Sequence, residues 1–173
     1  MNIQVVRWTY PSAMAKEGAA RKTEPRWLTP DEMQTWRTLH LALAALPAEL
    51  GRQLQCDSKL SFIEYYVLAS LSDQPDHSMR LSELAILANS ELSRLSHLAA
   101  RLEKRGLVRR EADPTDGRFT RAILTSKGHK ELIKAAPGHV TNVRHLIFDA
   151  LSTADQHALR NALMKILTHM DVC

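Results

Sequence analysis

Five polar side chains between positions 93 and 101 have the types and the spacing to hydrogen-bond to the edges of nucleic-acid bases. They are two hydroxyls, one imidazole and two guanidiniums: Ser93, Ser96, His97, Arg94 and Arg101. A guanidinium can pair bidentately with guanine, whereas serine and histidine make shorter contacts. We therefore expect Arg94 to reach a base, with Ser93, Ser96 and His97 beside it. Arg101 follows two turns further along.

An amphipathic helix must position these groups. Its apolar stripe recurs at i, i+3, i+4 and i+7: Leu95, Leu98, Ala99 and Leu102. The polar candidates lie on and beside the opposite face. Ser90 suits the N-cap of this helix, and Gly106 can supply the left-handed residue that ends it. A solvated helix face without a ligand is the simpler interpretation of an isolated basic helix, so the surroundings must decide.

A short helix and a β-ribbon flank this amphipathic helix. The short helix is predicted to begin with Ser82 at its N-cap, within reach of a phosphate. After Gly106, the sequence LVRRE and a DPTDGR loop at 113–118 predict a two-stranded antiparallel ribbon. At the ribbon's tip Arg118 can enter a minor groove, and Asp116 is expected to orient a nearby arginine, either Arg118 or one on the long helix. This order of elements is a winged helix-turn-helix, which places one helix in a DNA major groove.

The net charge of the chain is concentrated in the same segment. The whole chain has a formal charge of +4. The segment from His77 to Gly128 contains ten Lys or Arg and six Asp or Glu, so it holds the entire excess. Such local positive charge is expected of a surface that binds phosphates. Charge and element order together favour double-stranded DNA as the partner.

The residues that carry this pattern resemble a known family. The run LSRLSHLAARLEKRGLVRRE at 92–111, followed by DPTDGR and AILTSKG, is similar to the MarR family of bacterial transcription factors. The resemblance covers roughly 28–170 and is strongest over 81–128. It implies a homodimer in which outer helices pair two winged lobes on palindromic DNA. It also implies a ligand-responsive regulator, most often a repressor.

Long apolar stripes lie on both sides of the winged segment. They are Trp36, Leu39, Leu43, Leu46 and Leu50; Ile133, Ala136, Val140, Val143 and Ile147; and Leu159, Leu163, Ile166 and Met170. The first helix is predicted to begin after Thr29, and a capping box of Ser152 and Asp155 precedes the third. Some of these residues must form core within the chain. A small lobe cannot cover all three stripes, so we expect a second copy of the chain to cover the rest.

Two prolines fall inside these expected helices. Pro47 and Pro137 each remove an amide donor and crowd the preceding turn, so a kink is expected at both. The apolar rhythm continues past each proline, which argues against a complete stop. We therefore expect kinks at both, although Gly138 beside Pro137 makes a true break more likely there than at Pro47.

The segment Ser61–Leu71 is predicted to be a buried helix, because it is apolar around most of its circumference and Ser61 and Glu64 form a capping box. If enclosed, Tyr65 and Tyr66 need partners for their hydroxyls. Together with Trp36 and His40, they are the candidates for the small aromatic effector that the family resemblance suggests. Core packing is the alternative interpretation of each of these side chains.

Other functional classes find less support in the sequence. The eight histidines include His139 and His145, whose spacing of six residues matches no metal-binding pattern on a helix. Cys56 and Cys173 fit neither a disulfide framework nor a zinc site, and an inert thiol is favoured over a redox switch. We find no catalytic motif, so an enzyme is not expected. A metal-responsive or thiol-responsive regulator and a winged-helix protein-interaction module remain as alternatives.

The sequence thus predicts a mainly α-helical protein with a small antiparallel β-wing, dimeric through its N- and C-terminal helices. Residues 1–28 form an N-terminal arm, and 29–173 form one MarR-like domain. Within it, 29–76 and 126–173 are dimerisation and core helices, and 77–125 is the DNA-binding lobe. No cofactor or metal is expected. With no apolar run of about 20 residues and no secretory signal, we expect a cytoplasmic protein without a membrane partner.

Overall fold

The computed structural model describes residues 25–170, which fall into two compact units, one ending at Trp36 and the other beginning at Arg37. The first unit contains the start of α1 (Pro30–Ser58). The backbone N–H of Thr29 donates to Glu32 Oε2 at 2.8 Å, and the N–H of Glu32 donates to Thr29 Oγ1 at 3.3 Å. This reciprocal cap confirms the predicted helix start. The predicted arm at 1–28 lies almost wholly outside the described residues.

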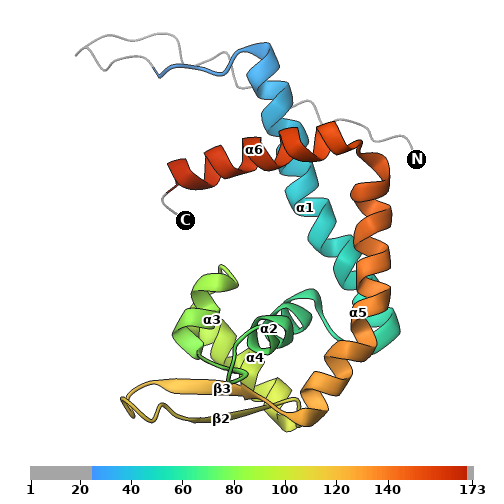
Figure 1. The fold of residues 1–173 in the computed structure, drawn as a ribbon. Helices are drawn as coiled ribbons and strands as arrows, with labels where there is room; N and C mark the ends of the chain where they lie inside the picture. The colour runs from blue at the N-terminus through green and yellow to red at the C-terminus, as the bar shows by residue number, and fades with distance from the viewer. Residues whose placement is uncertain (1–24, 171–173) are drawn as a thin grey trace, which may run out of the picture. The chain divides into compact units, whose positions relative to one another are not determined.

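The second unit contains the remainder of α1 and every later element (Figure 1). These are α2 (Phe62–Ser72), β1 (Ser78–Arg80), α3 (Leu81–Leu87), α4 (Leu92–Lys104), β2 (Val108–Ala112), β3 (Thr120–Leu124), α5 (Ser126–Leu146), the 3-10 turn η2 (Phe148–Ala150) and α6 (Thr153–His169). The predicted fold class, mainly helical with a small antiparallel sheet, is therefore confirmed. No helix within residues 25–170 is long and apolar enough to cross a membrane.

The sheet has three strands in the order β1-β3-β2, all antiparallel. Val108 pairs with Leu124 and Ala112 with Thr120, which gives the predicted ribbon. The third strand was not predicted: β1 pairs Arg80 with Arg121 along the other edge of β3. Three residues are too few for an alternating pattern to appear in the sequence. The strand nevertheless ties the start of the helix-turn-helix directly to the wing.

The apolar stripe of α4 forms part of the core, as its spacing predicts. Leu95, Leu98, Ala99 and Leu102 are all buried, and they join one cluster that includes Leu68 of α2. The capping box of Ser61 and Glu64 at the start of α2 is also present. However, α2 is not buried on all sides. Val67, Leu68 and Leu71 are buried, whereas Tyr66 is 37% exposed.

Two of the predicted helix caps are wrong. The N-cap of α4 is Glu91, not Ser90. The N-cap of α3 is Arg80, whose N–H donates to Glu83 Oε2 at 3.2 Å, so Ser82 lies inside the helix. In both cases the helix begins one or two residues away from the serine that residue type alone would choose as the cap. Gly106, with φ of 72°, does follow the end of α4 in the left-handed conformation as predicted.

Neither proline ends its helix. Pro47 lies within α1 and Pro137 within α5, so both helices continue past their prolines as predicted, and no break occurs at Gly138. Gly138 has another role, because a Cβ there would lie 3.0 Å from Gln53 Nε2 on α1. The missing side chain permits the close approach of α5 and the second half of α1.

The last helix, α6, begins at the predicted capping box of Ser152 and Asp155. Its predicted apolar stripe of Leu159, Leu163, Ile166 and Met170 is exposed in the single chain, and α6 has no buried residue. An apolar face of this kind lacks a partner within the described part of the chain.

Candidate nucleic-acid interface

The face of α4 opposite its buried stripe is open to solvent. Ser93, Arg94, His97 and Arg101 are exposed, and Ser96 is half-buried. A hollow of about 360 Å³ along this helix is lined by Arg94, His97 and Arg101 together with apolar side chains that include Ile63 of α2. The structure therefore brings three of the predicted side chains onto one side of α4, while Ser82 lies half-buried in α3.

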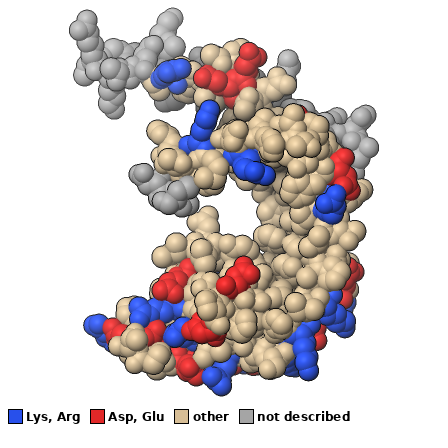
Figure 2. Space-filling model, viewed as in Figure 1, with Lys and Arg blue, Asp and Glu red and all other residues tan. Residues whose placement is uncertain are grey.

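The cations of the lobe divide into paired and unpaired groups. Figure 2 shows Lys and Arg gathered with Asp and Glu on the part of the surface formed by the lobe. The ion pairs are Arg80–Asp113, Arg94–Glu91, Arg105–Glu64, Arg109–Glu111, Arg110–Glu103, Arg118–Asp116 and Arg121–Asp76. Within residues 25–170, Arg101 and Lys104 on α4 have no such partner. Their charge is free to attract phosphates.

Arg94 is held only weakly. Its Nε lies 3.5 Å from Glu91 Oε2, and the two side chains are 78% and 72% exposed. Exposed pairs of this length contribute little, because water screens the attraction and the side chains lose conformational freedom. Arg94 can therefore leave Glu91 for a base edge at small cost.

The wing arginine is held much more firmly. Arg118 donates from Nε to Asp116 Oδ1 at 3.0 Å and from Nη2 to Asp116 Oδ2 at 2.7 Å, and its backbone N–H also donates to Oδ1 at 3.1 Å. These hydrogen bonds from Arg118 lower the pKa of the Asp116 carboxyl. Of the two arginine partners expected for Asp116, the structure selects Arg118 rather than one on α4.

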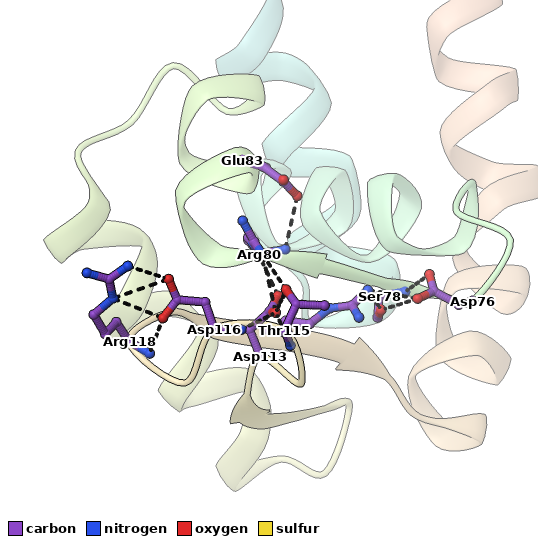
Figure 3. A network of polar contacts seen from close by, with 9 residues as sticks. Asp76, Ser78, Arg80, Glu83, Asp113, Thr115, Asp116 and Arg118 are labelled. Atoms are coloured by element: carbon purple, nitrogen blue, oxygen red, sulfur yellow. Dashed lines mark hydrogen bonds and ion pairs between the residues drawn. The ribbon is translucent and has the colours of Figure 1, made fainter.

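A second polar network at the base of the wing was not found by sequence reasoning (Figure 3). Arg80 donates to both carboxylate oxygens of Asp113, from Nε to Oδ2 at 2.7 Å and from Nη2 to Oδ1 at 3.2 Å. Its Nη2 also lies 2.9 Å from Thr115 Oγ1. Arg80 and Asp113 are 33 positions apart, and only the unpredicted strand β1 brings them together. No local pattern could have revealed the pair.

Asp113 is the buried centre of this network. The residue is only 6% exposed. Hydrogen bonds from Arg80 and then from Thr115 hold the pKa of its carboxyl well below the usual range, because they stabilise the charged form. Arg121 adds a further positive charge, with its Nε 4.0 Å from Asp113 Oδ2 while its Nη2 pairs with Asp76 at 2.7 Å.

The four candidates for an effector pocket have different surroundings. The ring of Tyr65 on α2 packs against His139 on α5, with 4.3 Å between ring centroids. Tyr66 is exposed, as are Trp36 and His40 on α1. The sequence alone does not predict the surroundings of His139. In the structure its Nδ1 is buried without a hydrogen-bond partner, and burial lowers its pKa.

The described residues provide no additional support for a metal-responsive or thiol-responsive regulator. Within residues 25–170, no three His, Cys, Asp or Glu side chains are grouped to hold a metal ion. Cys56 is an exposed free thiol on α1, and Cys173 lies outside the described residues.

A helix-turn-helix followed by an antiparallel wing, with exposed cations on its second helix, defines a winged helix-turn-helix protein. A sequence profile of the MarR family matches residues 60–120. The crystal structure of Sco3205, a MarR family transcriptional regulator from Streptomyces coelicolor in complex with DNA, is 44% identical, with a TM-score of 0.78 over 84% of this chain and 91% of that one. AbsC, a MarR family regulator from the same organism, is 37% identical, with a TM-score of 0.79 over 85% of this chain and 99% of its own. The chain therefore belongs to the MarR family.

A curated relative is similar over a shorter segment. The transcriptional repressor MprA of Escherichia coli (strain K12) is 33% identical over 107 residues. That segment covers 62% of this chain and 60% of MprA, so the chain spans less than two thirds of this relative's length.

Proposed function

We propose that the chain is a transcriptional regulator that binds double-stranded DNA sequence-specifically, with α4 in the major groove. The observation that carries the proposal is the exposed face of α4, where Ser93, Arg94 and His97 stand opposite a fully buried stripe. A recognition helix needs both a core-facing anchor and a solvent-facing set of hydrogen-bonding groups. The 44% identity to Sco3205, which was solved with DNA, supports the same function.

Each candidate side chain has a role in this proposal. Arg94 pairs with a base, and Ser93, Ser96 and His97 make shorter contacts beside it. Ser82 on α3 and Arg101 on α4 bind phosphates, which fixes the position of the helix without reading sequence.

The wing makes the minor-groove contact. Arg118 is 87% exposed at its side chain, and a narrow A·T-rich minor groove attracts such a group through its negative potential. Asp116 orients Arg118 through the hydrogen bonds described above.

The functional form is a homodimer on a palindromic operator. The exposed apolar side chains of α6 need a covering surface, and a second copy of α6 and of the N-terminal helix provides one. Two recognition helices then lie one DNA turn apart, about 34–36 Å. The protein acts in the cytoplasm, where its DNA partner is found.

The regulator acts as a repressor that a small aromatic effector releases. MprA is named as a repressor, which supports this direction of control. The effector would lodge beside His40, Tyr65 and Tyr66 of the second unit. It must bind more tightly to a dimer geometry whose recognition helices no longer match the operator, because equal affinity for both geometries shifts nothing.

Selection of duplexes from a random library tests the proposal. The purified full-length chain is expected to enrich a palindrome at moderate salt and to sediment as a dimer. A challenge of the complex with a panel of aromatic acids then tests release. A monomer with no preference among duplexes would contradict the proposed function.

A further inference from the structure

Arg80 joins the start of the helix-turn-helix to the wing, and we propose that it is a positioning residue that fixes where the wing arginine Arg118 lies. The inference rests on the proposed function, because it assigns Arg80 an indirect part in minor-groove recognition. Three successive sets of contacts connect Arg80 to Arg118 (Figure 3).

The first link fixes Arg80 itself and then Asp113. The backbone of Arg80 pairs with Arg121 in the sheet, and its N–H caps α3 through Glu83. Its guanidinium donates hydrogen bonds to both carboxylate oxygens of Asp113. The guanidinium carbon Cζ also lies 4.8 Å from the centre of the Phe119 ring. A planar guanidinium suits such a two-pronged contact, and lysine does not.

The second link runs from Asp113 into the wing loop. Asp113 Oδ1 accepts from the backbone N–H of Thr115 at 2.9 Å, from Thr115 Oγ1 at 2.6 Å and from the N–H of Asp116 at 3.2 Å. The N–H of Asp113 donates to the carbonyl of Phe119 at 2.9 Å and so closes the loop. The position of Asp116 therefore depends on the Asp113 carboxylate that Arg80 holds.

The third link is the pair of Asp116 and Arg118. Asp116 is half-buried, whereas the side chain of Arg118 is 87% exposed. A long exposed arginine loses conformational freedom when it enters a groove, and a partner that restricts it beforehand reduces this loss. The three links thus connect an exposed DNA-facing group to the start of α3.

Arg80 is not itself a phosphate contact in this arrangement. Its Nε and Nη2 donors bond to Asp113 and Thr115, and its side chain is 31% exposed. Loss of Arg80 should therefore act through Arg118 and not through the charge of the lobe.

The test measures the preference of the full-length chain for flanking sequence. The probe is a duplex that the wild type selects, prepared with either A·T or G·C pairs at its flanks. The measured ratio is the Kd for the duplex with G·C flanks divided by the Kd for the duplex with A·T flanks. The Arg80→Gln variant should reduce this ratio by about tenfold, as expected for loss of one charged hydrogen-bonding group. In an Arg118→Ala background the same change should leave the ratio unaltered, because coupled residues are not additive.

Arg110→Gln is the matched control. It removes one positive charge from the same lobe, but Arg110 pairs with Glu103 on α4 and not with the wing loop. It should weaken binding to both duplexes alike and leave their ratio unchanged. Independent, additive effects of Arg80→Gln and Arg118→Ala on the ratio would overturn the proposal, as would an unchanged ratio in Arg80→Gln alone.

Amide hydrogen exchange of the free protein separates this inference from the proposed function. The Thr115 and Asp116 amides should exchange at least about tenfold faster in Arg80→Gln, while α4 keeps its protection. Unchanged exchange would overturn the positioning role. If the wild type selects no duplex, the proposed function fails, and exchange alone decides whether Arg80 positions the wing.

A second variant keeps the test valid if Arg80→Gln does not fold. Thr115→Val removes, from an exposed residue, the hydroxyl that contacts both Arg80 and Asp113. It should shift the flank ratio and the Asp116 exchange in the same direction by a smaller factor. Wild-type values of both quantities in Thr115→Val would contradict the proposal.

Discussion

The recognition helix and the wing present positive charge in opposite ways. On α4, Arg101 and Lys104 have no ion-pair partner within residues 25–170, and Arg94 is only loosely held by Glu91. In the wing, Arg118 is bound by Asp116, and Arg80 at the base of the wing is bound by the buried Asp113.

Under the proposed function, this difference gives one lobe two modes of contact with DNA. Loosely held side chains can adjust to the base edges and phosphates they meet, whereas a restrained side chain meets one groove geometry without further ordering. The net charge of +4 does not distinguish these cases, because it counts a tethered arginine and a free one equally.

The largest effect is expected from a core substitution that disrupts the exposed face of α4 and the wing together. Leu102 is fully buried on the core-facing side of α4, so Leu102→Ala should lower the free energy of unfolding by about 2–5 kcal/mol and abolish binding through both helix and wing. Ile86 is 79% exposed, and Ile86→Ala should change stability by no more than about 0.5 kcal/mol. Urea denaturation measures both. Equal stabilities would mean that the core described here does not support the lobe.

The next prediction distinguishes the roles of two arginines on α4, Arg94 and Arg101. Arg94→Ala should cost about 1–3 kcal/mol of binding and relax specificity at one base position. Arg101→Ala should weaken binding to all duplexes alike and reduce the slope of log K against log salt by about one. Titrations on the selected and a scrambled duplex at several salt concentrations distinguish them. Equal losses on both duplexes for Arg94→Ala would remove its base-reading role.

Acid should loosen the wing network through Asp113. Its pKa is lowered in the folded state, so its contribution to stability is present above the unfolded pKa of about 3.9 and is lost as pH falls below it. The free energy of unfolding of the wild type should therefore fall more steeply below that pH than that of Asp113→Asn. Asp73→Asn, an exposed carboxylate in the same unit, controls for the lost charge. Parallel curves for Asp113→Asn and the wild type would contradict the network.

A smaller effect is expected away from both surfaces, at His139. Burial lowers its pKa, so the neutral ring stabilises the fold above the unfolded pKa of about 6.5, and this contribution declines as pH falls. His139→Phe keeps a ring against Tyr65 and should flatten the dependence of Tm on pH below that value. His145→Phe, at an exposed position of α5, should not. If Tm still depends on pH in the same way in His139→Phe, a group other than His139 causes that dependence.

The sequence predicted features that depend on local pattern. The stripe of Leu95, Leu98 and Leu102, the left-handed Gly106 and the capping box at Ser61 are all present. Each depends on residues within two turns of one another, where spacing and side-chain type decide the conformation.

The features that were missed depend on distant residues or on boundaries. The Arg80–Asp113 pair exists because β1 adds to the sheet, which no local spacing indicates. The caps at Ser90 and Ser82 were placed by residue type, but the helices begin elsewhere by one or two positions. His139 acquires its environment only when α5 packs against Tyr65 of α2.

Dimethyl sulfate protection of guanine N7 on the selected duplex tests the central claim most directly, because this atom lies in the major groove. The account predicts protected guanines in two half-sites about one helical turn apart, with protection at one position of each half-site lost in Arg94→Ala. Binding without any protected guanine, or an unchanged pattern in Arg94→Ala, would contradict the claim that α4 reads the major groove.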